Sequence, residues 1–166
     1  MKKIILIGCP GGGKSSLARE LHRLTDIPLF YLDMMYWNPD KTIVEREIFL
    51  ERISDAIKGE RWIIDGNYGS TLEMRLVACD TVIFLDYPTE LCLDGVRSRR
   101  GKQREDLPWV ETEEDAEFME YIRGFTEKNR PVILDLLEKY KDGRRVIILK
   151  SREDAEVFLK QIEREL

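Results

Sequence analysis

The sequence of 166 residues predicts an α/β protein, a three-layer α/β/α sandwich around a five-stranded parallel sheet. Two observations carry this prediction. Short apolar runs do not alternate apolar with polar residues, which is typical of strands buried on both faces of a parallel sheet. The segments between the runs place apolar residues at helical spacing, so strands and helices alternate. The runs are Ile4–Ile7, Leu29–Leu32, Trp62–Ile64, Val82–Leu85 and Val146–Leu149.

Three helices are indicated by apolar residues three or four positions apart. One follows a glycine-rich segment, one lies between the second and third runs, and one lies near the C-terminus. Right-handed crossovers should connect the parallel strands. The apolar positions are Leu17, Leu21 and Leu24 in the first helix, Phe49, Ile53 and Ile57 in the second, and Ala155, Phe158, Leu159 and Ile162 in the third.

The stretch from Cys92 to Tyr140 interrupts this alternation, because it is long, highly charged and has no run typical of a strand. Residues Glu113–Tyr140 are expected to be helical, with Pro131 starting a new helix or kinking the old one. The chain has no internal repeat and no flexible linker. We therefore expect residues 1–166 to form a single domain with a short helical insert at about residues 95–125.

The composition narrows the class of protein. The formal net charge is −5, which argues against a general nucleic-acid coat protein but leaves room for a local basic pocket. Three cysteines, at positions 9, 79 and 92, are odd in number and lack C-x-x-C spacing, so a reducing compartment fits best. The first apolar run ends at Gly8, too early for a signal peptide or a membrane span. A cytoplasmic location is predicted.

A phosphate-binding loop is the strongest signal in the sequence. Residues Gly8–Ser15, Gly-Cys-Pro-Gly-Gly-Gly-Lys-Ser, fit the pattern G-x-x-x-x-G-K-[ST] between an apolar run and a helix. Its glycines allow backbone N–H groups to turn toward phosphate oxygens, and the helix N-terminus adds its dipole. The residues expected to bind nucleotide are Gly8, Pro10, Gly11, Gly12, Gly13, Lys14, Ser15 and Ser16. The alternative is a glycine-rich turn that only connects a strand to a helix.

Two side chains of this loop have expected chemical roles. Lys14 can bridge the outer phosphates of a nucleoside triphosphate, and the Ser15 hydroxyl can ligate Mg²⁺. The expected cofactors are therefore ATP, with GTP as the alternative, and Mg²⁺.

The chain resembles the adenylate-kinase-like group of P-loop kinases and, more closely, the bacterial DNA topology modulation proteins. The resemblance covers nearly the whole chain and implies the nucleoside-monophosphate-kinase-like fold and kinase-like chemistry. Nothing in the sequence reads as a DNA-reading motif, although the family's name comes from an effect on DNA supercoiling. The blocks that carry the resemblance are Gly8–Ser15, Leu32–Pro39, Trp62–Tyr68, Arg97–Arg100 and Asn129–Pro131.

Carboxylates follow or end three of the predicted strands, at the edge where open α/β sheets bind ligands. Asp65 precedes Gly66, as does an aspartate that organises the water around the metal in adenylate kinases, and is our first choice for Mg²⁺. Asp33 is second, either for metal or as the base that accepts a proton from the acceptor hydroxyl. Asp86 is expected to be structural, capping the turn before Pro88. For all three, the alternative is a carboxylate that only satisfies N–H groups of a turn.

Several residues are candidates for the acceptor pocket. Asn67 and Tyr68 follow a glycine at a strand end, and Arg75 could hold an acceptor phosphate. Tyr36 and Trp37 could stack on a planar substrate. Trp37 could instead cover the core.

An arginine-rich stretch from Arg97 to Arg104 resembles the lid of adenylate-kinase-like enzymes, where arginines stabilise charge on the transferred phosphoryl group. Arg97 and Arg100 are three residues apart and are expected to share a helix face as the leading pair, with Arg99 off that face. Arg123 and Arg130 resemble a second arginine set in those kinases. The alternative is a solvated basic face balanced by acidic residues.

Two functions follow. The first is a kinase that transfers the γ-phosphoryl group of ATP to a small acceptor, with a nucleotide as one candidate acceptor and with Lys14, Asp33, Arg97 and Arg100 as catalytic residues. The second is a nucleotide-dependent switch or slow NTPase that acts on a protein or DNA partner. The acceptor-side residues favour the first. No membrane partner is expected.

Overall fold

The computed structural model describes residues 1–166 and contains a single sheet of five parallel strands in the order β2-β3-β1-β4-β5. The central strand β1 lies between β3 and β4. The chain passes from β1 to β2 at one edge, returns to β3, and then crosses to β4 on the other side of β1. This change of direction opens a crevice at the carboxyl ends of the strands. The strands are β1 (Lys3–Gly8), β2 (Leu29–Tyr31), β3 (Trp62–Asp65), β4 (Thr81–Leu85) and β5 (Arg145–Leu149).

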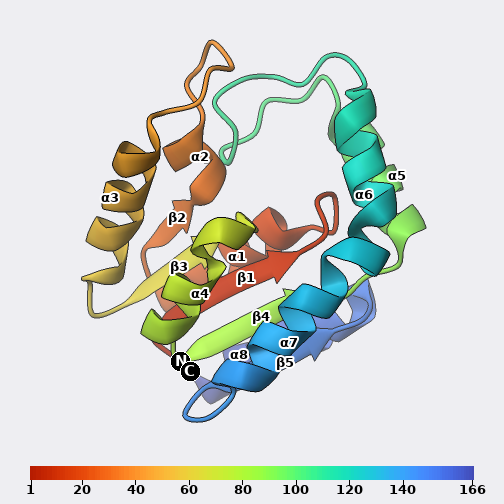
Figure 1. The fold of residues 1–166 in the computed structure, drawn as a ribbon. Helices are drawn as coiled ribbons and strands as arrows, with labels where there is room; N and C mark the ends of the chain where they lie inside the picture. Colours follow the sequence, from red (N-terminus) through yellow and green to blue (C-terminus); the bar gives the residue numbers. More distant parts are fainter.

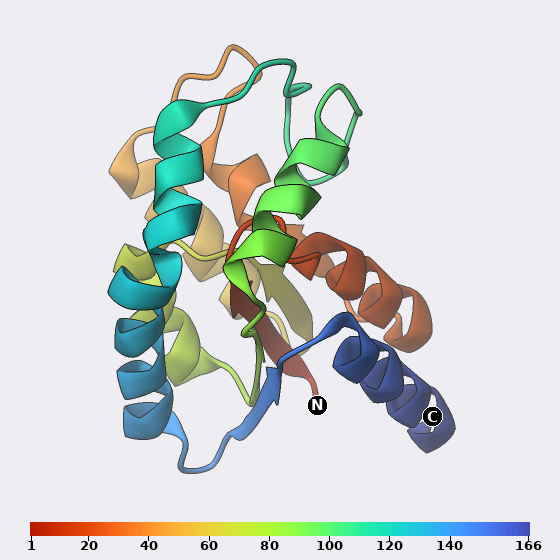
Figure 2. The ribbon, with the colours of Figure 1, turned by 90° about the vertical axis from the view of Figure 1, so that its right-hand side faces the viewer.

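Helices cover both faces of the sheet (Figures 1 and 2). In Figure 2, α1 and α8 lie together on one side, and α3, α4 and α7 lie on the other. Helices α5 and α6 stand beside each other above the carboxyl edge of the sheet. The helices are α1 (Lys14–Thr25), α2 (Leu32–Tyr36), α3 (Arg46–Ile57), α4 (Gly69–Ala78), α5 (Thr89–Arg99), α6 (Ala116–Lys128), α7 (Arg130–Tyr140) and α8 (Arg152–Glu165).

The three central strands supply the middle of the core. Nearly every side chain of β1, β3 and β4 is buried, whereas the edge strands β2 and β5 are partly exposed. This is the burial that non-alternating apolar runs produce when helices cover both faces. None of the helices is long and apolar enough to cross a membrane.

The predicted fold class is confirmed: all five apolar runs form parallel strands, with helices on both sides of the sheet. Four of the strands extend one residue beyond their apolar run at one or both ends, whereas the second is shorter, because Leu32 begins the short helix α2 instead of ending β2. Pro131 lies in the first turn of α7 and so starts a new helix, where its missing N–H costs nothing.

Residues 100–115, between α5 and α6, form an irregular segment that we call the lid segment. It folds back on itself, with the Gly101 N–H donating to the Glu111 carbonyl oxygen. In Figure 1 it extends from the tops of α5 and α6 across the carboxyl edge toward α2.

Candidate active site

The glycine-rich loop connects β1 to α1 at the centre of the carboxyl edge. Gly11 and Gly13 have φ angles of +82° and +88°, which favour glycine. Gly13 caps α1, so Lys14 and Ser15 begin the helix and their free N–H groups face the loop. The Lys14 Nζ donates to the Cys9 carbonyl oxygen at 3.3 Å and lies over the loop.

The backbone of α5 rests directly on this loop. A β-carbon at Gly11 would lie 2.0 Å from the Cys92 carbonyl oxygen, and one at Gly95 would lie 2.0 Å from the Gly11 carbonyl oxygen. Neither position can therefore carry a side chain without separating the helix from the loop. Glycine at both positions places the C-terminal end of α5, and with it Arg99, close to the loop.

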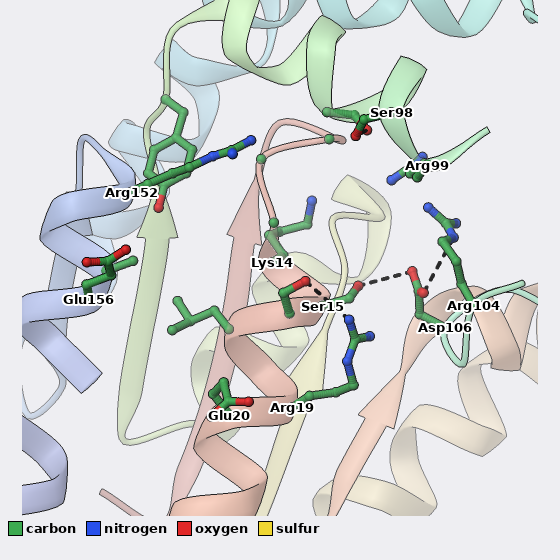
Figure 3. A pocket seen from close by; sticks show the side chains of 18 of the residues that line it. Lys14, Ser15, Arg19, Glu20, Ser98, Arg99, Arg104, Asp106, Arg152 and Glu156 are labelled. Atoms are coloured by element: carbon green, nitrogen blue, oxygen red, sulfur yellow. Dashed lines mark hydrogen bonds and ion pairs between the residues drawn. The ribbon is translucent and has the colours of Figure 1, made fainter. Parts of the chain in front are cut away.

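A cavity of about 490 Å³ opens beside the loop, between α1, α5, α8 and the lid segment. Of the expected nucleotide-binding residues, Gly11 to Ser16 line it, whereas Gly8 and Pro10 do not. Five cationic side chains face three carboxylates, and Figure 3 shows Arg152 on one side of Lys14 and Arg99 and Arg104 on the other. The cations are Lys14, Arg19, Arg99, Arg104 and Arg152, and the acids are Glu20, Asp106 and Glu156.

Ser15 lines this cavity and is hydrogen-bonded to the buried Asp65, the last residue of β3. The Ser15 Oγ donates to Asp65 Oδ2 at 2.5 Å, while Asp65 Oδ1 is buried and has no hydrogen-bond partner. Burial raises the pKa of the Asp65 carboxyl to about 6, although Lys14 and the Ser15 hydrogen bond act in the opposite direction. A hydroxyl beside a buried, unsatisfied carboxylate oxygen fits a hard cation such as Mg²⁺, which binds oxygen ligands.

Asp33 lies in the first turn of α2, not at the end of a strand. Tyr68, the N-cap residue of α4, has a left-handed backbone and donates its hydroxyl to Asp33 Oδ1 at 2.5 Å. Burial raises the pKa of the Asp33 carboxyl, and the Tyr68 hydrogen bond and Lys14 lower it. A raised pKa makes a carboxylate a better proton acceptor, as a general base requires.

Two candidates for the acceptor pocket instead hold the backbone together. The Asn67 side chain accepts from the Gly8 N–H at 3.0 Å and donates to the Gly8 carbonyl oxygen at 2.6 Å, which fixes the start of the phosphate loop. Arg75 is fully buried, and its guanidinium donates to the carbonyl oxygens of Gly66, Asn67 and Tyr68. The expectation that Arg75 holds an acceptor phosphate is therefore wrong, because none of its surface is open to a ligand.

The arginines of the lid region are arranged differently from our expectation. Arg97 and Arg100 do lie side by side, but both face Glu114, at 3.6 and 3.5 Å, and neither lines the cavity. Arg99 and Arg104 line it instead. Helix α5 ends at Arg99 and Arg100 has extended backbone angles, so the helical spacing does not continue through the stretch.

Glu111 holds the two cavity arginines together. Its Oε1 lies 3.1 Å from Arg99 Nε, an ion pair without the alignment of a hydrogen bond, and 3.3 Å from the Arg104 guanidinium. Burial lowers the pKa of Arg99, and the nearby charge of Arg104 acts in the same direction. The fold thus holds the two guanidinium groups close together although they repel each other. Two adjacent arginines of this kind provide the charge that an oligophosphate would neutralise.

The remaining candidates lie outside the cavity. Asp86 accepts two hydrogen bonds of 2.8 and 2.9 Å from the Arg130 guanidinium. Its role is therefore structural, but it forms an ion pair with Arg130 and does not cap the turn before Pro88 as expected. Arg123 pairs with Glu120 on the exposed face of α6. Trp37 packs edge-on against Trp109 of the lid segment, with ring centroids 5.1 Å apart.

Sequence reasoning did not select several residues of the cavity wall, among them Arg152, Arg19 and Asp106. Arg152 begins α8 immediately after β5, and its position at the carboxyl edge of a strand was a signal that could have identified it. Arg19 lies one turn after Ser15 on α1. Asp106 belongs to the lid segment, whose path is irregular, so no periodic pattern marks it.

The fold, the loop and the cavity beside it define a P-loop protein with the nucleoside-monophosphate-kinase-like fold. No protein-family model matches the chain. A shikimate kinase from Rhodococcus jostii (strain RHA1) is 33% identical over 98 residues, which cover 51% of this chain and 58% of that protein. The match thus spans little more than half of the relative's length.

Solved structures agree on the fold. The shikimate kinase from Acinetobacter baumannii in complex with shikimate aligns with 98% of this chain and 90% of its own, at a TM-score of 0.62 and 18% identity. The shikimate kinase from Bacteroides thetaiotaomicron aligns with 98% of both chains, at a TM-score of 0.58 and 20% identity.

Proposed function

We propose that the protein is an ATP-dependent phosphotransferase that transfers the γ-phosphoryl group to a small acceptor. The observation that carries this proposal is the cavity beside the phosphate loop, with its five cationic side chains. A cationic pocket over a helix N-terminus suits an oligophosphate. The sequence match to a shikimate kinase and the likeness of fold support the same class of reaction.

In this proposal, each group at the loop has one task. Lys14 and the loop N–H groups bind the outer phosphates, and Arg99 and Arg104 stabilise the charge of the transferred group. Ser15 and Asp65 hold Mg²⁺, which neutralises phosphate charge when bound. Asp33, whose pKa burial raises, accepts the proton of the acceptor hydroxyl.

The acceptor is proposed by class only. Asp33 suits a hydroxyl acceptor, and the relatives include a shikimate kinase in complex with shikimate, so a small hydroxy acid is one candidate. A nucleoside monophosphate is the other. Kinship with the DNA topology modulation proteins is proposed from the sequence blocks alone. The cytoplasmic location stays a prediction from the cysteines.

The test is transfer of label from γ-labelled ATP to a panel of hydroxy acids, including shikimate, and nucleoside monophosphates. We expect transfer to one class, dependent on Mg²⁺, lost in Lys14→Ala and retained in Lys58→Ala, which removes a lysine on the exposed surface. ATP hydrolysis without transfer to any acceptor would favour the switch or slow NTPase. No ATP binding by the wild type would refute both.

A further inference from the structure

Asp106 is a buried carboxylate to which the proposed function assigns no role. It lies in the irregular lid segment yet is only 6% exposed. Its Oδ2 is 3.1 Å from the Ser15 Oγ, and its Oδ1 is 3.6 Å from Arg104 Nε. Figure 3 shows it reaching from the lid segment to the start of α1. The lid segment therefore contacts the residue expected to ligate Mg²⁺.

The hydrogen bonds around Ser15 do not satisfy this cluster. The Ser15 Oγ lies 2.5 Å from Asp65 Oδ2 and 3.1 Å from Asp106 Oδ2, but a hydroxyl carries one proton and can donate to one of them at a time. The other oxygen of Asp65 is buried without any partner, in a residue that is 5% exposed. Lys14, the nearest cation of the loop, is bonded to the Cys9 carbonyl oxygen. Two carboxylates therefore compete for the single proton of the Ser15 hydroxyl, and that proton cannot satisfy both of them.

We propose that Asp106 is a ligand of the Mg²⁺ that binds with the nucleotide, completing with Ser15 and Asp65 a cation site that spans the loop and the lid segment. Adjacent ligands of an octahedral Mg²⁺, with bonds of 2.0–2.1 Å, lie about 2.9 Å apart. The two oxygen–oxygen distances at Ser15 bracket this value. Mg²⁺ in phosphoryl-transfer sites is held by one or two carboxylates and the substrate phosphates, so a second carboxylate fits its needs.

The inference rests on the proposed function and gives the lid segment a metal-dependent position. Arg104 lies two residues from Asp106 and pairs with it, so the bond that fixes Asp106 also places Arg104 over the phosphates. Trp109, three residues further on, packs against Trp37 of the α2 region. Mg²⁺ should therefore draw the lid segment onto the site, whereas nucleotide without metal should leave it less ordered.

The experiment compares the wild type with Asp106→Asn by calorimetric titration of a non-hydrolysable ATP analogue, once with Mg²⁺ and once with a chelator. We expect the substitution to weaken binding in Mg²⁺ by about tenfold or more, the scale of losing a metal-site partner, and binding in chelator by less than about twofold. Electron paramagnetic resonance of Mn²⁺ in the complex with the same analogue should show that Asp106→Asn binds Mn²⁺ more weakly than the wild type does. Glu105→Gln, the exposed neighbour with the same loss of charge, should match the wild type.

The outcomes are distinct. Equal Mg²⁺ dependence in Asp106→Asn and wild type overturns the inference and leaves the proposed function standing. Tighter binding of the Mg²⁺ complex by Asp106→Asn also overturns it, because Asp106 would then obstruct the metal site. A wild type that binds no analogue in either condition overturns the proposed function and this inference together. Asp106→Ala provides a second variant, and thermal unfolding establishes that both are folded.

Discussion

At the scale of single residues, the proposed metal ligand Asp65 carries a cost to stability. Its carboxyl is 5% exposed, and one oxygen has no partner. Its pKa rises from 3.8 to about 6 on folding. The folded protein thus binds this proton more tightly than the unfolded chain does, so ionisation favours unfolding. The cost is absent below pH 3.8, grows between pH 3.8 and 6, and is fully present above pH 6.

Asp65→Asn should therefore stabilise the metal-free protein. At pH 7 we expect a gain of up to about 3 kcal/mol in the free energy of unfolding, falling to roughly half at pH 5. Urea unfolding at the two pH values measures this difference. The same variant should lose Mg²⁺-dependent turnover far more than it loses binding of metal-free nucleotide. A variant less stable than the wild type at pH 7 would contradict the argument.

At the scale of elements, the lid region shows why neighbouring arginines have different roles. Spacing predicted Arg97 and Arg100 for the nucleotide, because three residues on a helix share a face. The end of α5 at Arg99 is set by tertiary packing and by the path of the lid segment, which no local pattern reveals. Consequently Arg99 and Arg104 reach the cavity, and Arg97 and Arg100 bind Glu114.

We predict that Arg99→Ala and Arg104→Ala lower kcat by about a hundredfold or more, with a smaller effect on nucleotide affinity, because these charges act mainly in the transition state. Arg97→Ala is the matched control from the same element. Its exposed ion pairs contribute roughly 0–1 kcal/mol, so activity and thermal stability should stay close to wild type. Steady-state kinetics with the identified acceptor decide between the two sets. Loss of kcat only in Arg97→Ala would contradict this prediction and would support the catalytic role that the helical spacing predicted for Arg97.

At the scale of the whole molecule, the sequence predicts the fold well because its signals are local. Non-alternating runs such as Ile4–Ile7 form strands buried on both faces, and the Gly8–Ser15 pattern places a loop between a strand and a helix. The site was predicted only in part. Asp65 and Ser15 follow from their positions at strand and helix ends. Asp106, Arg152 and the burial of Arg75 depend on how distant segments pack, and no spacing within one segment encodes this.

Nucleotide binding should stabilise the whole fold, because the cavity joins α1, α5, α8 and the lid segment. A ligand at a concentration 100 times its Kd adds about 2.7 kcal/mol, which corresponds to roughly 5–10 °C in Tm for a domain of this size. Thermal unfolding with Mg²⁺ and a non-hydrolysable ATP analogue should show this increase in the wild type. Lys14→Ala should show almost none, while its Tm without ligand stays near that of the wild type.

The contact between Gly11 and Gly95 has a consequence for local opening of the backbone. No side chain separates the loop from α5, so the helix cannot fray or tilt there without losing its contact with the Gly11 carbonyl oxygen. A phosphate that holds the loop N–H groups should therefore also restrain the helix. Amide hydrogens of residues 92–96 would exchange more slowly in the nucleotide complex, although these residues need not touch the phosphate. Hydrogen exchange of α5 would thus report whether the loop is occupied.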